Sequence, residues 1–298
     1  MNGIVDIYHD LKENPGFNNK LVGDDYLFME YKCPVETEKF QLLSEYHFIT
    51  YVITGEKDWI AQDKIVKLRA GQAIFLRKGV YTIKQYFDVD HCVLTFFIND
   101  NFIKNFIMQN TAAVTSEKQE VMDDIFVLDV NDTLRSLFQS MYHYLQMGTS
   151  IPRNLVELKF NELLFNIMLN PRHQNLMYYF NSLNQPGYAK MDSVMMKNFQ
   201  HDLQLEEFAR LCGKSLSTFK RDFQAYYKQT PGKWLTDKRL EFAKTLLLRS
   251  DMNVNEVCYE SGFRNSSHFN KAFKEKYQLP PKQFRSMSET PGRLAVSA

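Results

Sequence analysis

The chain has 298 residues, of which 44% are hydrophobic and 24% are charged, and its net charge is +1. This length is enough for two domains that each bury a core of their own. No apolar run approaches the ~20 residues that span a bilayer, and the first ten residues lack the basic start of a secretory signal. We therefore expect a cytoplasmic protein.

The charge is distributed unevenly between the two parts of the chain. Residues 188–298 contain 19 Lys and Arg against 12 Asp and Glu, a net charge of +7, whereas residues 1–187 contain 17 against 23, a net charge of −6. Such asymmetry predicts a polyanionic partner for the C-terminal part and argues against one for the N-terminal part.

Residues 25–98 have the pattern of short strands separated by turns. The runs are rich in β-branched and aromatic residues and cover residues 48–55, 64–68, 73–76, 81–87 and 92–98. Turn residues, including several glycines, lie between them. Short strands at this spacing are typical of an antiparallel sandwich or barrel.

Aromatic side chains at inward positions of such a barrel are candidates for an effector site, because the mouths of barrels commonly bind small molecules. The candidates are Tyr46, Phe48, Tyr51, Trp59, Phe75, Tyr81 and Phe96. The alternative is that these rings only fill a closed core, as they do in most small barrels.

The histidines and cysteines do not indicate an enzyme. The seven histidines include no His-x-His pair, and Tyr81 stands where metal-dependent barrels often place a late histidine. The four cysteines, Cys33, Cys92, Cys212 and Cys258, lie far apart and predict reduced thiols, not a zinc site or a disulfide framework. We find no nucleophile elbow, P-loop or dinucleotide fingerprint. We therefore expect no catalysis, no metal and no cofactor.

After residue 98 the hydrophobic period becomes helical. Helices are predicted at 99–108, 132–148 and 153–169, and the short connection between the last two predicts an antiparallel helical hairpin. The helix at 153–169 is apolar on more than one face. Leu155, Leu158, Leu163 and Phe165 are therefore candidates for a partner surface. Packing against the barrel is the alternative.

Residues 184–190 are rich in helix breakers and form the expected linker. A helix is predicted after it at 191–199, and residues 288–298 form an expected flexible tail.

The stretch 204–285 contains one pattern twice. Residues 205–213 and 217–227 form the first copy, and residues 254–262 and 267–277 form the second. Gly213 and Gly262 are 49 residues apart, whereas Phe219 and Phe269 are 50 apart. Each copy reads as a helix-turn-helix, in which the glycine supplies the positive φ of the turn.

The second helix of each copy has a polar face opposite its aromatic face. The polar positions are Ser217, Lys220, Arg221 and Gln224 in the first copy, and Ser267, His268, Asn270, Lys271 and Lys274 in the second. These side chains can donate to base edges or phosphates in the major groove, which admits an α-helix. A solvated helix face is the alternative for one copy alone, but two copies in register argue against it.

The helix predicted at 234–249 joins the two copies. At ~1.5 Å per residue, it is about long enough to hold two recognition helices one DNA turn apart, ~34 Å.

Residues 204–285 resemble the DNA-binding domain of the AraC/XylS family of bacterial transcription regulators, most closely at 261–277 and 280–285. The family's usual glycine before the second proline motif is replaced by Gln278 and Leu279. Residues 51–55 and 68–79 resemble the family's cupin-like sensor barrel. The resemblance implies that Ser217, Lys220 and Arg221 read bases in the first copy, and that Ser267, His268, Asn270 and Lys271 do so in the second. It also implies that the helical hairpin dimerises.

The expected fold is α+β, with a cupin-like β-barrel and an αα-hairpin at 1–183, a linker at 184–190, and an all-α domain with two helix-turn-helix units at 191–287. The expected function is sequence-specific transcription regulation, more commonly activation. A small-molecule or protein effector would act on the N-terminal domain. The expected partners of the whole protein are a double-stranded DNA operator, RNA polymerase and a second copy of the chain. An architectural DNA-binding protein and a cupin enzyme fused to a DNA tether are the alternatives.

Overall fold

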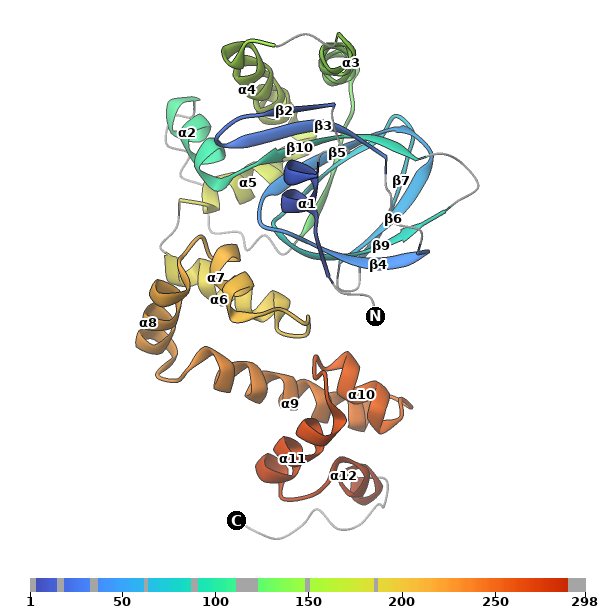
Figure 1. The fold of residues 1–298 in the computed structure, drawn as a ribbon, viewed down its shortest axis with the longest axis vertical. Helices are drawn as coiled ribbons and strands as arrows, with labels where there is room; N and C mark the ends of the chain where they lie inside the picture. Colours follow the sequence, from blue (N-terminus) through green and yellow to red (C-terminus); the bar gives the residue numbers. More distant parts are fainter. Residues whose placement is uncertain are drawn as a thin grey trace. The chain divides into compact units, whose positions relative to one another are not determined.

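The chain folds into two compact units, Met1–Pro186 and Gly187–Ala298. The computed structural model describes residues 4–14, 19–32, 37–61, 64–86, 91–110, 123–147, 151–184 and 187–288. Figure 1 shows strands and helices in the first unit and helices α6 to α12 in the second. Cys33, Gly148 and almost all of the predicted tail lie outside the described residues.

Two β-sheets form the centre of the first unit. The five-stranded sheet has the order β1 (Val5–Asp6), β4 (Lys39–Ser44), β9 (Gly79–Gln85), β6 (Glu56–Ala61) and β7 (Lys64–Arg69). The six-stranded sheet has the order β11 (Ile125–Leu128), β8 (Ala73–Leu76), β5 (His47–Thr54), β10 (Cys92–Ile98), β3 (Tyr26–Lys32) and β2 (Lys20–Val22). Only β1 and β4 pair in parallel among the described strands. The described strands form two separate sheets and not a closed barrel, so the cupin-like barrel is not confirmed.

Strand β5 is buried on both faces because the six-stranded sheet lies between two hydrophobic clusters. Phe48 and Val52 belong to the cluster between the two sheets, which also contains Trp59 and Tyr81. Ile49 belongs to the cluster on the opposite face, which the helices cover. Alternate side chains of a strand point to opposite faces, so a single strand contributes to both cores.

The helices of the first unit lie mainly beside the six-stranded sheet (Figure 1). They are α2 (Asp100–Asn110), α3 (Asp132–Gln146), α4 (Arg153–Leu169) and α5 (Gln174–Ser182), with a 3₁₀ turn at Pro171–His173. Helix α1 (Ile7–Glu13) packs against β4 instead. The two helices of the predicted hairpin, α3 and α4, contact each other. Within the described residues, no helix is long and apolar enough to cross a membrane.

A buried polar network surrounds His47. Its Nε2 lies 2.9 Å from Asp100 Oδ1, and its Nδ1 accepts from the backbone N–H of Lys78 at 3.1 Å. The Lys78 ammonium lies 2.9 Å from Asp100 Oδ2. Because Nδ1 is an acceptor, the neutral ring carries its proton on Nε2 and donates it to Asp100. Burial lowers the pKa of His47 to about 4. The ring therefore stays neutral at physiological pH and has a structural place in the fold.

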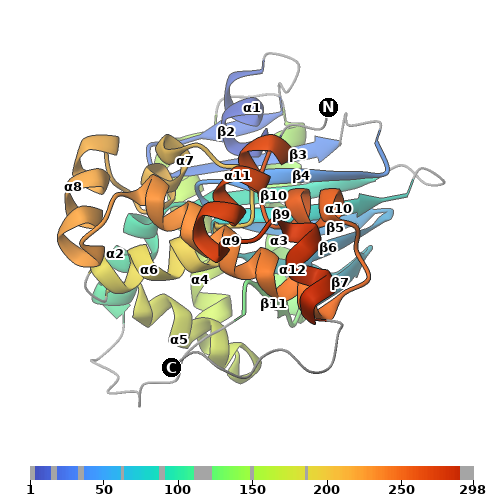
Figure 2. The ribbon, with the colours of Figure 1, turned by 90° about the horizontal axis from the view of Figure 1, so that it is seen from below.

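The second unit contains helices only, within the part of the chain that is described. They are α6 (Gly187–Asn198), α7 (Leu205–Leu211), α8 (Leu216–Tyr227), α9 (Pro231–Arg249), α10 (Val254–Glu260), α11 (Ser266–Tyr277) and α12 (Pro281–Ser288). Figure 2 shows α9 between α8 on one side and α10 and α12 on the other. Helix α6 begins inside the range expected for the linker, and the linker boundaries stay a prediction.

Candidate nucleic-acid interface

Two helix-turn-helix units, α7–α8 and α10–α11, are built in the same way. Gly213 and Gly262 have φ values of 68° and 88°, which confirms the left-handed turn expected from each glycine. In the helices before the turns, the side chains of Glu207 and Glu256 each accept from a backbone N–H at 2.6 Å. These reciprocal caps fix where both short helices begin.

The second helix of each unit is anchored by its aromatic face. Phe219 and Phe223 in α8, and Phe269 and Phe273 in α11, are completely buried. Helix α11 packs with Leu240, Ala243 and Leu247 of α9 in one hydrophobic cluster. In α8, Phe223 contacts Trp234 of α9 edge to face, with 6.0 Å between ring centroids. Both recognition helices are therefore seated on the same long helix.

All nine polar residues predicted to contact DNA are exposed. They are Ser217, Lys220, Arg221, Gln224, Ser267, His268, Asn270, Lys271 and Lys274. Four positions on each helix follow the spacing i, i+3, i+4 and i+7, which places them on one face of the helix. The structure therefore brings these side chains together as two matching polar faces, opposite the buried phenylalanines.

Local ion pairs shape the first of these faces. Asp222 Oδ2 lies 2.7 Å from the ammonium of Lys214, and Asp222 Oδ1 lies 3.3 Å from Nε of Arg221. The hydrogen bond from Lys214 is the main reason why the pKa of Asp222 is lowered, and Arg221 lowers it further. Arg221 itself is 75% exposed, so its guanidinium remains accessible to a ligand.

Sequence reasoning missed Arg239, which links the segment between α6 and α7 to α9. Its Nε donates to the carbonyl of Phe199 at 2.7 Å, and its Nη2 donates to the carbonyl of His201 at 2.9 Å. A Cβ at Gly262 would lie 2.7 Å from the oxygen of Gln200 and 2.9 Å from Nε of Arg239. The segment between α6 and α7 thus touches both α9 and the second turn.

A nearby ion pair joins the same segment to the turn between α10 and α11. The side chain of Arg264 donates to the carboxylate of Asp202. Arg239 stands four residues after Leu235 and four before Ala243 on α9, and both of these side chains are buried. An arginine among the buried positions of an amphipathic helix predicts a set of buried acceptors, and this signal was available in the sequence.

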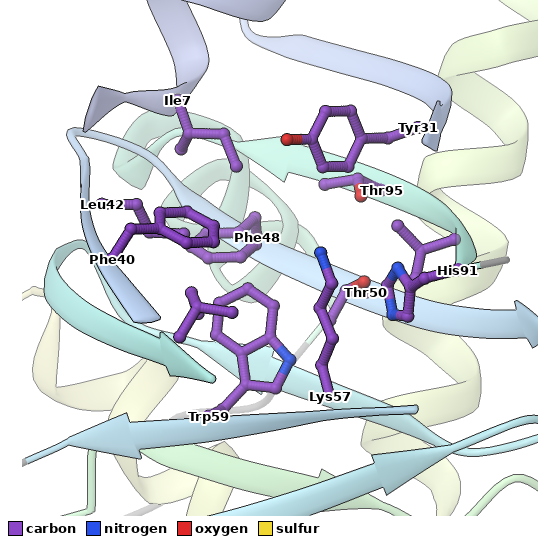
Figure 3. Close-up of a pocket in the computed structure, with 12 residues that line it drawn as sticks. Ile7, Tyr31, Phe40, Leu42, Phe48, Thr50, Lys57, Trp59, His91 and Thr95 are labelled. Atoms are coloured by element: carbon purple, nitrogen blue, oxygen red, sulfur yellow. The ribbon is translucent and has the colours of Figure 1, made fainter. Parts of the chain in front are cut away.

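The candidate effector residues do not gather at one site. Phe48 and Trp59 line a cavity between the two sheets (Figure 3), and Tyr46 and Tyr81 belong to the surrounding cluster. The expectation of an inward position is wrong for Tyr51, Phe75 and Phe96, which face the helices on the other side of the sheet. The ring of Tyr51 stacks on Phe138 of α3 with 4.4 Å between centroids.

The candidate dimer residues on α4 also divide into two groups. Leu158 is 63% exposed and Phe165 is 36% exposed, and Leu155 is half-buried. Leu163 is completely buried in the core beneath the helices. It therefore cannot contribute to a surface of the folded unit, and its place in the expected interface is corrected. Leu169, which the prediction omitted, is 74% exposed.

The sequence matches two families of known proteins. Residues 47–179 match the ExsA N-terminal regulatory domain, and residues 208–287 match the helix-turn-helix domain. Over 226 residues the chain is 26% identical to the HTH-type transcriptional regulator ExsA of Pseudomonas aeruginosa, covering 75% of this chain and 80% of ExsA. Over 236 residues it is 22% identical to the virulence regulon transcriptional activator VirF of Yersinia enterocolitica, covering 78% and 87% of the two chains.

A crystal structure of an apo ToxT variant from Vibrio cholerae covers 89% of this chain and 98% of its own, with 11% identity and a TM-score of 0.43. The paired helix-turn-helix units and the relatives across both halves of the sequence lead to one conclusion. The chain belongs to the AraC/XylS family of DNA-binding transcription regulators.

Proposed function

We propose that α8 and α11 read two successive major-groove segments on one side of an operator. The observation that carries this proposal is the pair of exposed polar faces with the same spacing, both seated on α9. A recognition helix contacts base edges with residues near its N-terminus. Ser217, Lys220 and Arg221 occupy this position in α8, and Ser267, His268, Asn270 and Lys271 occupy it in α11.

The side chains divide into two roles by their chemistry. Arg221 can form a bidentate pair with guanine, and Asn270 can do so with adenine. Gln224 and Lys274 lie about one turn further along their helices, where they can contact phosphates. The +7 charge of residues 188–298 adds a contribution that does not depend on the DNA sequence.

The chain acts as a transcriptional activator, as the name of VirF supports. In this role it works in the cytoplasm and contacts RNA polymerase. The N-terminal unit, as a cupin-like domain, receives a small-molecule or protein effector. Its match to the ExsA N-terminal regulatory domain supports this regulatory role. Two copies dimerise through α4, where the exposed Leu158, Phe165 and Leu169 support a partner surface.

The test of DNA reading is selection of bound duplexes from a random pool by the full-length protein at two salt concentrations. The parent should enrich a two-segment motif with about one helical turn, ~34 Å, between its segments. Arg221→Ala should lose base preference in one segment, and Lys271→Ala should lose it in the other. Each loss should weaken operator binding by roughly 5- to 100-fold, the value of one base contact.

The matched control is Lys39→Ala, which removes an exposed positive charge from the first unit. It should enrich the same motif as the parent. If the parent enriches no motif and its binding fades equally on all sequences as salt rises, the specific-regulator proposal fails. An architectural DNA-binding role would then replace it.

A further inference from the structure

The two recognition helices differ by one carboxylate beside their polar faces. Equivalent positions of α8 and α11 are 50 residues apart, so Arg221 corresponds to Lys271, and Asp222 corresponds to Ala272. Both faces therefore carry a cation at the same position of the helix. A carboxylate follows this cation in α8, whereas a methyl group follows it in α11.

Asp222 is fixed in place by the turn that precedes its helix. Its Oδ2 accepts a hydrogen bond from the ammonium of Lys214 at 2.7 Å, and the two side chains are only 18% and 22% exposed. The backbone N–H of Lys214 donates in turn to the carbonyl of Ala209 at 2.9 Å, at the end of α7. A charge-assisted hydrogen bond between two largely buried groups holds its geometry more firmly than an exposed ion pair does. The carboxylate of Asp222 therefore has a defined orientation.

The second oxygen of this carboxylate orients Arg221. Nε of Arg221 donates to Oδ1 of Asp222 at 3.3 Å, and the rest of the guanidinium is exposed. Within the described part of the chain, the terminal nitrogens Nη1 and Nη2 of Arg221 have no partner. These two nitrogens form the end of a planar fork that fits O6 and N7 of guanine. The bond through Nε thus leaves the guanine-reading edge available and reduces the rotamer entropy that Arg221 loses on meeting a base.

Lys271 has no such support in α11. Its ammonium is a point charge on a flexible chain, without the two parallel donors of a guanidinium. The methyl group of Ala272 cannot accept a hydrogen bond from it. At this position, α8 therefore has the chemistry for stringent reading of one base, and α11 does not.

We propose that Asp222 is a specificity-determining residue of the first recognition helix. Asp222 touches no base itself, but it positions Arg221 for a guanine in the first operator segment. Its negative charge also repels the phosphates of any duplex, so it lowers affinity for every sequence while it raises discrimination. The inference rests on the proposed function, because it requires α8 to read bases. It deepens that function by assigning a base and by predicting a more stringent first segment.

The test uses four duplexes and the full-length protein. They are the duplex that the parent protein selects and its three single-base variants at the position where Arg221→Ala loses base preference. Fluorescence anisotropy measures the affinity for each duplex. The parent should prefer guanine at this position, and Asp222→Asn should reduce the preference roughly threefold or more, part of the roughly 5- to 100-fold that one bidentate pair supplies. Asparagine fills the same space but has one oxygen, which serves Lys214 or Arg221 and not both.

Three further measurements separate positioning from charge and from folding. Asp222→Asn should bind the three duplexes without guanine more tightly than the parent does, whereas a loss of folded structure would weaken all four. Asp222→Glu, which keeps the charge but moves the carboxylate, should lose preference for guanine without this gain. In an Arg221→Ala background, Asp222→Asn should leave the relative affinities for the four duplexes unchanged, because no guanidinium remains to be oriented.

The matched control is Glu275→Gln, which removes an exposed negative charge from α11. It should strengthen binding to all four duplexes alike and keep the parent's preference for guanine. Circular dichroism at the assay temperature verifies that each variant is folded.

The inference is overturned if Asp222→Asn and Asp222→Glu both keep the parent's preference, or if the preferred base is not guanine. It is also overturned if Asp222→Asn changes the relative affinities as much without Arg221 as with it. In each of these outcomes the parent still selects a two-segment operator, so only this inference is contradicted. A parent that selects no motif, or an Arg221→Ala protein that keeps the parent's preferences, contradicts the proposed function and this inference with it.

Discussion

Within the described ranges, two residues other than glycine adopt a left-handed backbone conformation, and they lie at equivalent helix ends. Lys228, after α8, has φ 56°, and Gln278, after α11, has φ 62°. Side chains resist this conformation, and glycine adopts it without steric cost. Gln278 stands where the family usually has glycine. The departure therefore changes the energy of a helix end, not the polar face of α11.

Gln278→Gly should stabilise the protein. Relief of the left-handed strain should raise the free energy of unfolding of the second unit by about 0.5–1 kcal/mol. The greater backbone entropy of glycine in the unfolded chain reduces this gain. Urea denaturation monitored by circular dichroism measures the change. Lys274→Gly, inside the same helix, is the control and should lower stability by about 1 kcal/mol. A destabilised Gln278→Gly protein would contradict the strain argument.

The first unit should lose stability on acidification because of His47. Its pKa is about 4 in the folded state, well below the ~6.5 of an unfolded chain. Below pH ~6.5 the unfolded state therefore binds the proton first, and stability is lost as pH falls towards 4. His47→Gln should be less stable at pH 7 but should lose about 2 kcal/mol less than the parent between pH 7 and pH 5.

Thermal unfolding followed by near-ultraviolet circular dichroism measures this difference. The pKa of His91 is lowered too, so His91 also contributes to the parent's loss of stability on acidification. The difference in this loss between the parent and His47→Gln therefore reports on His47 alone. Equal losses in both proteins would show that His47 does not titrate as described.

At the level of whole elements, Arg239 sets the geometry between the two helix-turn-helix units. Arg239→Met removes donors to the carbonyls of Phe199 and His201. It should lower the stability of the second unit by about 1–3 kcal/mol. The variant should also bind an operator with one inserted base pair between its segments more nearly as well as the normal operator. The reason is that the turn between α10 and α11 is held less firmly.

Electrophoretic mobility shifts on operators of both spacings measure this discrimination, at a temperature where the variant is folded. Lys238→Met is the matched control, because Lys238 pairs with Glu241 on the same helix. A folded Arg239→Met protein with the parent's preference for spacing would refute the positioning role.

Helix α4 carries the proposed dimer contact. Leu158, Phe165 and Leu169 are exposed at positions that fall on one stripe of the helix. Leu158→Glu should shift the protein from dimer to monomer in sedimentation velocity and change its folding stability by less than about 0.5 kcal/mol, as expected of a surface site. Ile65→Glu, at an equally exposed position on β7, should leave the dimer intact. A parent protein that is monomeric at every concentration would refute the contact.

The sequence predicted the strongly periodic elements and the polar faces of α8 and α11. These faces follow directly from helical spacing opposite buried phenylalanines. It did not predict β1 to β4, β6 or β11 as separate strands. Strand β6 includes Lys57 and Asp58, whose charges hide its alternation, and β11 has only four residues. Tyr51, Phe75 and Phe96 were misplaced because the six-stranded sheet is covered on both faces, so a hydrophobic residue does not reveal which core it enters.

For the whole molecule, the uneven charge predicts a steep dependence of operator binding on salt. The logarithm of the binding constant should fall linearly with the logarithm of salt concentration, by about 0.9 for each phosphate contact. Lys274→Gln should reduce the magnitude of this slope by about 1 without changing the preferred sequence. Lys39→Gln, in the acidic first part, should leave the slope unchanged. An unaltered slope in Lys274→Gln would remove Lys274 from the phosphate contacts.

Helix α9 also restricts how this regulator can evolve. It has 19 residues and seats both recognition helices. Inserting one residue would turn the second reading unit by about 100° relative to the first, away from the groove. Only insertions of about a full turn, ~5.4 Å, would restore its orientation, and this step does not match the ~3.4 Å between base pairs. The bases within the two operator segments can therefore change during evolution, whereas the distance between the segments cannot. A new promoter would become a target through base substitutions in two segments that already have this separation.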